Sequence, residues 1–183
     1  MTTSVRFNKC LGIAVLAGSL MASSVHADDG ISGFRQFEFG SSVSDIEKLI
    51  AITLKETESG SNVIYRSQEP TIIGDKAYMT SFEFEDDSLK QVNLTQNEAE
   101  VLRMHCDLIY QTTADQVTST YGPWNTTEKD ISLLGVQIKA QRKNFTDTSS
   151  LVVNQVHTLQ PNEYAGACSV SVMYNAPSNG GTF

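Results

Sequence analysis

The sequence is poor in cysteine, tryptophan and positive charge, and the shortage of positive charge argues against two classes of partner. Its 183 residues include three cysteines, one tryptophan and 13 lysine or arginine residues, against 21 aspartate and glutamate residues, for a net charge of −8. Proteins that bind nucleic acid or anionic lipid need a basic surface. The balance therefore argues against both partners. It permits a cationic partner, and the plain alternative is that acidity keeps the protein soluble.

Several catalytic motifs are also missing. The chain has no GxSxG of serine hydrolases, no phosphate-binding loop and no dinucleotide fingerprint. The histidines and cysteines after residue 27 have no zinc-ligand spacing, so we expect no metal and no cofactor. Paired carboxylates of a glycoside hydrolase are brought together by the fold, so one sequence cannot reveal them. A cell-envelope hydrolase that uses carboxylates therefore stays open.

Residues 1–27 have the three-part order of a secretory signal peptide. Arg6 and Lys9 precede a short apolar run, and Val25 and Ala27 occupy the small-residue positions of a cleavage site. The alternative is an uncleaved anchor, but the run is shorter than the ~20 residues that span a bilayer. Cleavage would leave 11 basic and 21 acidic residues, a net charge of −10. We expect a periplasmic or secreted protein without membrane insertion.

The first part of the mature chain predicts a strand and then a helix. Residues 31–40, "ISGFRQFEFG", alternate as a strand that Gly40 ends. Residues 41–58 predict a helix in which Ser42 is the N-cap and Asp45 completes an acidic variant of the capping box. Its apolar stripe consists of Ile46, Leu49, Ile50 and Leu54.

Residues 77–96 give the clearest local signal, an antiparallel hairpin. A short strand over residues 61–67 precedes it. Tyr78, Phe82 and Phe84 alternate with polar residues, turn residues follow, and Val92 and Leu94 resume the alternation. Four acids lie on this hairpin and its turn: Glu83, Glu85, Asp86 and Asp87. They have no calcium-loop spacing, so they form either a solvated face or a contact for a basic partner.

Residues 97–121 predict a second helix. Asn97 is placed to cap it, Glu100 to complete a capping box, and Gly122 to end it. The apolar face consists of Leu102, Cys106, Ile109, Thr113, Val117 and Tyr121. A second helix start at Thr113 leaves open a break near Thr112.

Three further strands are expected after the second helix. They lie within residues 131–145, where Val136, Ile138 and Ala140 alternate with polar residues, within 150–159, and within 167–174. The order predicts one α+β domain over residues 28–176, with two main helices packed on one face of antiparallel sheet, and a flexible tail over 177–183. A helix followed by a β-meander occurs twice, either by internal duplication or because two ordinary helix starts look alike.

The segment "RMHCDLIYQ" places His105, Cys106 and Asp107 side by side, which resembles a reactive centre. Successive helical residues turn by 100°, so these three side chains cannot converge on one ion or substrate atom. Export favours disulfides, and Cys106 and Cys168 both lie on apolar faces. We therefore predict a disulfide between them. The difficulty is that a helix lying flat on a sheet is far from a strand for disulfide geometry.

Trp124 follows the second helix in the loop "YGPWN". An exposed tryptophan beside a turn can anchor an interface, whereas most large aromatic side chains are largely buried. Trp124 and the four hairpin acids are the candidate interface, and no catalytic residue is assigned.

At "FEFGSSVSDI" and "TTADQVTSTYGPW" the chain resembles a group of small exported bacterial proteins, which includes the β-lactamase inhibitory protein and the small lipoprotein of outer-membrane assembly. It departs from the group in lacking a lipid-attachment cysteine and in having Ser41 where Met is usual. The resemblance implies a protein that binds other proteins and is not an enzyme. We expect an inhibitor or immunity-type protein for a basic partner; the alternatives are the hydrolase and a structural component of envelope assembly.

Overall fold

The computed structural model describes residues 30–57, 62–125, 129–133, 135–159 and 165–178. The predicted signal peptide and the end of the predicted tail lie outside these residues. The first part of the chain forms β1 (Gly33–Phe34), β2 (Phe37–Glu38), α1 (Val43–Glu47), β3 (Ile52–Thr57), β4 (Asn62–Ser67), β5 (Thr71–Ile73), β6 (Lys76–Glu85) and β7 (Ser88–Leu102). The second part forms α2 (Arg103–Tyr121), β8 (Lys129–Leu133), β9 (Val136–Asn144), β10 (Ser150–Leu159) and β11 (Ala165–Asn175).

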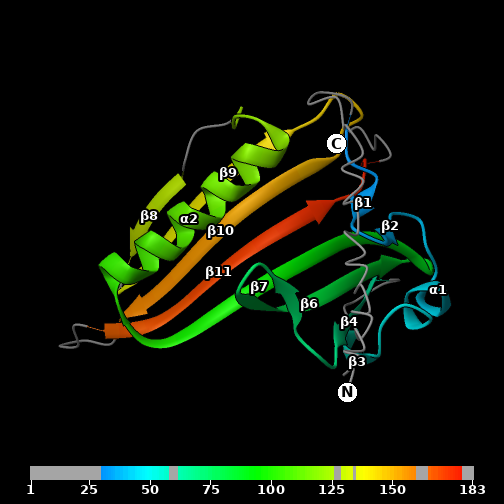
Figure 1. Cartoon of the computed structure of the whole chain (residues 1–183), viewed down its shortest axis with the longest axis horizontal. Helices are drawn as coiled ribbons and strands as arrows, with labels where there is room; N and C mark the ends of the chain where they lie inside the picture. The colour runs from blue at the N-terminus through cyan, green and yellow to red at the C-terminus, as the bar shows by residue number, and fades with distance from the viewer. Residues whose placement is uncertain (1–29, 58–61, 126–128, 134, 160–164, 179–183) are drawn as a thin grey trace, which may run out of the picture.

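A large antiparallel sheet confirms the α+β prediction (Figure 1). Its strand order is β3-β4-β6-β7-β11-β10-β9-β8, and β5 pairs with the start of β6. Each helix is followed by a meander whose first strand lies at the sheet edge and whose last strand lies at the centre. The two last strands, β7 and β11, pair with each other. The predicted helix-plus-meander unit therefore occurs twice, joined at the middle of one sheet.

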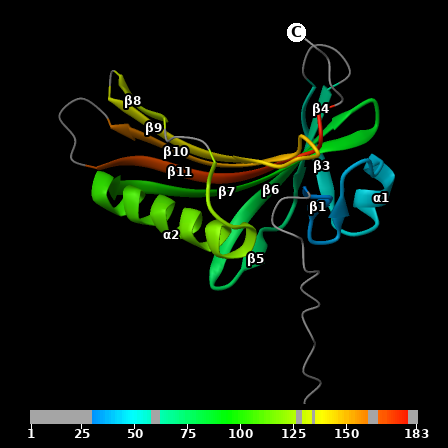
Figure 2. The same cartoon turned by 90° about the horizontal axis from the view of Figure 1, so that it is seen from above.

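The helix α2 covers one face of this sheet. Figure 2 shows α2, β5 and the β1–β2 hairpin on the same side, and no helix of the described residues on the other side. Beneath α2, Cys168, Val170, Val172 and Tyr174 of β11 are all buried, as their alternation predicts. Phe82 and Phe84 of β6 continue this core, where Phe82 and Phe37 make an edge-to-face contact at 4.9 Å between ring centroids.

The first helix is much shorter than predicted. Ser42 caps α1 and Asp45 completes the capping box as expected, but the helix ends at Glu47. Residues 52–57, expected to continue it, form β3 and pair with β4. Leu49, expected on the buried stripe, is 50% exposed. The ladder to β4 satisfies this segment's backbone groups and suits β-branched Ile52 and Thr53, so pairing overrides the helical pattern.

The predicted first strand is also broken. Residues 31–40 form the hairpin of β1 and β2 in place of one continuous strand. Arg35, in the turn, has a φ of +54°, which reverses the chain between Phe34 and Phe37. Both aromatic rings enter the core, one from each short strand.

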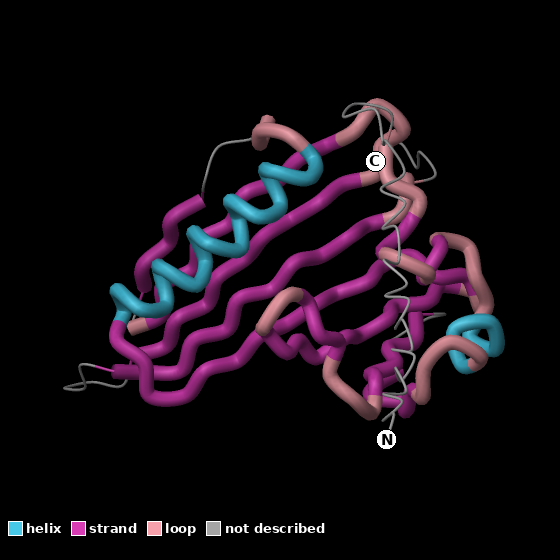
Figure 3. Tube along the Cα trace, in the orientation of Figure 1, coloured by secondary structure: helices cyan, strands magenta, loops and turns pink. Residues whose placement is uncertain are grey.

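The second helix begins six residues later than predicted. Asn97 and Glu100 lie in β7, which runs to Leu102, and Leu102 makes no side-chain cap. Asn97 pairs with Ser169 of β11, and a register shift accommodates Glu100, whose φ is +56°. The long ladder to β11 thus displaces the predicted capping box. From Arg103 onwards α2 is one unbroken helix to Tyr121, without a break at Thr112, as Figure 3 also shows.

The alternation expected in β9 is present, but its polar side chains face α2. Lys139 of β9 donates a hydrogen bond to Asp107 of α2, and Gln137 and Lys143, which share its side of the strand, are buried. Ile138 lies on the opposite face and is 37% exposed. The predicted strand over residues 131–145 is in fact the hairpin of β8 and β9.

Candidate functional site

The disulfide between Cys106 and Cys168 is present and buried. The two Cα atoms are 5.7 Å apart, and it joins α2 to the central strand β11. The expected difficulty with helix-to-strand distance is resolved because α2 starts directly from β7, the strand paired with β11, which holds its first turns close to the sheet. Cys106 is therefore not a free thiol nucleophile.

The neighbours of Cys106 diverge, as helix geometry predicts. His105 is exposed, whereas Asp107 accepts hydrogen bonds from Lys139 and from Gln155, each at 2.9 Å. Burial raises the pKa of Asp107, but the hydrogen bonds from Gln155 and Lys139 and the charges of Lys139 and Arg103 outweigh it, and the net shift lowers this pKa. Asp107 therefore anchors α2 to β9 and β10 as a carboxylate.

Three of the four predicted acids line one hollow at the hairpin tip. Glu83, Glu85 and Asp86 border a space of about 630 Å³ together with Lys90 and the segment Asn175–Ser178. Glu83 is the cross-strand neighbour of Gln91, and Gln91 is the neighbour of Asn175, to which it donates a hydrogen bond at 2.6 Å. These positions alternate with buried Phe82, Val92 and Tyr174, so the hollow lies on the sheet face that α2 leaves uncovered.

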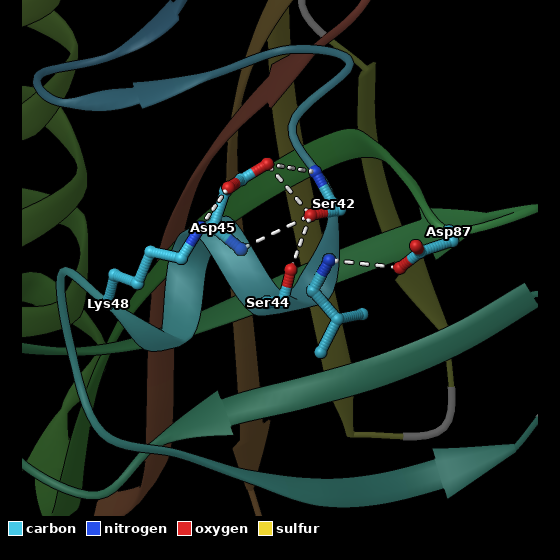
Figure 4. Close-up of polar contacts among 6 residues, drawn as sticks. Ser42, Ser44, Asp45, Lys48 and Asp87 are labelled. Carbon is cyan, nitrogen blue, oxygen red and sulfur yellow. Dashed lines mark hydrogen bonds and ion pairs between the residues drawn. The ribbon is translucent and has the colours of Figure 1, made fainter.

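The fourth acid, Asp87, has a structural role. Asp86 and Asp87 have φ values of +51° and +58°, which is the backbone of a tight two-residue hairpin turn. The Asp87 carboxylate accepts a hydrogen bond from the backbone N–H of Val43 at 3.0 Å (Figure 4). It therefore ties the turn to the first residue of α1.

Trp124 lies apart from the acidic hollow. It is half-buried and packs against the hydrophobic core. The neighbouring Asn125 fixes this loop to β9 by donating to the Asn144 carbonyl at 2.8 Å and accepting from the Asn144 N–H at 2.9 Å. The hollow and Trp124 share no lining residue, so the structure does not join them in one surface.

An apolar surface on α2 was not predicted as such. Leu102, Met104 and Leu108 are 52%, 77% and 64% exposed, and they border a groove of about 640 Å³ whose polar side is Asp107 and Lys139. The predicted helix start at Asn97 puts Leu102 on the buried face, whereas α2 begins at Arg103. The spacing of Met104 and Leu108, one helical turn apart and away from Cys106, is the signal that could have identified this stripe.

Within the described ranges, no group of three or more His, Cys, Asp or Glu side chains is arranged to hold a metal ion. The same residues include no helix long and apolar enough to cross a membrane. Comparison with protein-family models, curated proteins and solved structures finds no match to this chain.

Proposed function

We propose that this protein is an exported binding module without catalytic activity, and that it holds a basic protein partner on the uncovered face of its sheet. The observation that carries the proposal is the hollow at the hairpin tip, where Glu83, Glu85 and Asp86 gather on one open surface. Glu85 and Asp86 are exposed, so folding does not desolvate their charges and they are accessible to a partner. Complementary charges of this kind speed association and select the partner.

The role we propose is that of an inhibitor or immunity-type protein, which neutralises a cationic hydrolase or toxin by covering it. The buried disulfide suits an oxidising compartment such as the periplasm or the exterior. The hollow lies on the paired strands β6, β7 and β11, and this supports the role because preorganised surfaces lose little conformational entropy on binding. Among the described residues that line the hollow, Lys90 is the only one with a positive charge.

The test is capture from the producing organism's envelope extract and culture medium by the immobilised chain starting at Asp28. The variant E83Q/E85Q/D86N removes three charges while keeping side-chain shape. The matched control E38Q/E47Q/E69Q removes three exposed charges elsewhere. We expect one basic protein to be captured at low salt by the native chain and by the control, and on the order of tenfold less by the hollow variant.

Capture that is unchanged in the hollow variant, or insensitive to salt, would contradict the proposal. Glycosidase activity of the native chain that the hollow variant loses would instead favour the hydrolase, with these carboxylates as its catalytic pair. The exposure of Glu85 and Asp86 leads us to prefer binding, because a carboxyl that acts as a general acid is usually shielded from water.

A further inference from the structure

A small pocket lies on the opposite side of the sheet from the acidic hollow. It has a volume of about 190 Å³ and is enclosed by the C-terminal half of α2, by β5, by the β1–β2 hairpin and by the sheet. Its apolar lining residues are Phe34, Ile73, Leu94, Val117 and Val172. All of these except Ile73 are buried, so the walls are held by core packing.

Three tyrosines are also among the lining residues of this pocket. Tyr78, Tyr121 and Tyr174 all line it, one from β6, one from α2 and one from β11. The Tyr121 and Tyr174 rings are in a T-shaped arrangement, with 6.2 Å between their centroids. Burial raises the pKa of all three phenols, so they are neutral and can donate hydrogen bonds. A few converging polar groups in an apolar cavity are typical of small-molecule sites.

Arg35 places a positive charge at the mouth of the pocket. Its guanidinium carbon lies 5.3 Å from the centre of the Phe34 ring, and the group donates a hydrogen bond to the Ile72 carbonyl at 3.1 Å. These contacts hold an exposed side chain in place. Within the part of the chain that the structure describes, Arg35 forms no ion pair with a carboxylate. A negative charge lies nearby on Asp75, an exposed residue that acts electrostatically on Tyr78 and raises its pKa.

We propose that this pocket binds a small organic carboxylate, with its apolar body between α2 and the sheet and its carboxylate against Arg35. An apolar cavity of about 150 Å³ holds a benzene molecule, so 190 Å³ accommodates one ring or a short branched chain. A guanidinium binds carboxylates through charge-assisted hydrogen bonds, and tyrosine hydroxyls can add a further donor. This activity is separate from capture of a protein partner, because the two sites lie on opposite faces.

The experiment is a ¹⁵N chemical-shift titration of the mature chain with benzoate and with benzamide, its neutral counterpart of the same shape. We expect benzoate to saturate the shifts of the Ile73, Val117 and Val172 amides with a dissociation constant on the order of 1 mM. Benzamide should bind about tenfold more weakly, because it lacks the charge that Arg35 recognises.

Four variants test which residues contribute to the affinity for benzoate and benzamide. R35Q should weaken benzoate about tenfold and leave benzamide unchanged, whereas R103Q, at an exposed arginine on the first turn of α2, should change neither. D75N should strengthen benzoate by removing a repelling charge. V117F fills the cavity and should abolish both ligands in a chain whose circular dichroism remains native.

Several results would overturn the proposal: no saturable shifts with benzoate, equal affinity for benzoate and benzamide, or benzoate binding that R35Q leaves intact. Tighter binding of a short peptide ending in phenylalanine than of benzoate would assign the pocket to a protein terminus instead. R35Q should not alter capture of a basic partner, so failure here is distinguishable from failure at the acidic hollow.

Discussion

Reduction of the buried disulfide gives a prediction whose size follows from the structure. Cys106 and Cys168 are 62 residues apart in sequence, and the bridge restricts that loop in the unfolded chain. The chain-entropy relation gives about 4.3 kcal/mol for a loop of this length. Domains are typically stable by about 5–15 kcal/mol, so this one link supplies a large share.

The measurement is urea unfolding of the chain starting at Asp28, with and without dithiothreitol, followed by circular dichroism. For a denaturant dependence of about 2 kcal/mol per molar, reduction should lower the midpoint by about 2 M. The variant C106A/C168A controls for effects of the reductant, because its unfolding should not respond to dithiothreitol. Equal unfolding free energies with and without reductant would refute the reasoning, as would two free thiols in the unfolded, unreduced chain.

Three further predictions concern the polar links of the two helices. Replacing Asp107 by Asn should lower the unfolding free energy by about 1 kcal/mol at pH 7, because Lys139 loses its partner. Folding lowers the pKa of Asp107, so its contribution to stability is present above the unfolded pKa and is lost as pH falls through the folded pKa. The unfolding free energies of the variant and the native chain should therefore converge in acid. Ser42→Ala should lower the unfolding free energy by about 1 kcal/mol, because α1 loses the side chain that caps it. An NMR titration of the native chain should give Asp45 a pKa of about 2, mainly because Lys48 and then Ser42 hydrogen-bond its carboxylate. Asp87→Ala should speed hydrogen exchange at the Val43 amide and leave the amides of α2 unchanged, and unchanged exchange at Val43 would contradict the link from turn to helix.

Features that depend on a few residues close together in sequence could be predicted from the sequence. The capping box of Ser42 and Asp45 closes within one turn, and the alternation of Phe82 and Phe84 sets the buried face of β6. The disulfide was predictable because only two cysteines follow the apparent signal peptide and both lie on apolar faces. Each of these features depends on a few residues and on physical rules that hold in any fold.

Segments whose structure is set by pairing with a strand distant in sequence could not be predicted correctly. Asn97 and Glu100 resemble a helix start, yet β11 offers the same backbone a longer ladder. Residues 52–57 continue a helical stripe in sequence, yet β4 pairs with them. The error at Asn97 also hid the exposed stripe of Met104 and Leu108. The pocket below α2 needs Arg35, Tyr78 and Tyr174 from three separate segments, and no local signal joins them.

The meeting of β7 and β11 at the centre of the sheet has a consequence for the assembly of the chain. The first unit, formed alone as synthesis reaches Leu102, would leave β7 as a long strand with an open edge. Open edges pair with other chains, so two copies of such a fragment could join through β7, with the partner's β7 in the place of β11. In the whole chain β11 covers this edge, so a chain truncated before β11 should dimerise or aggregate.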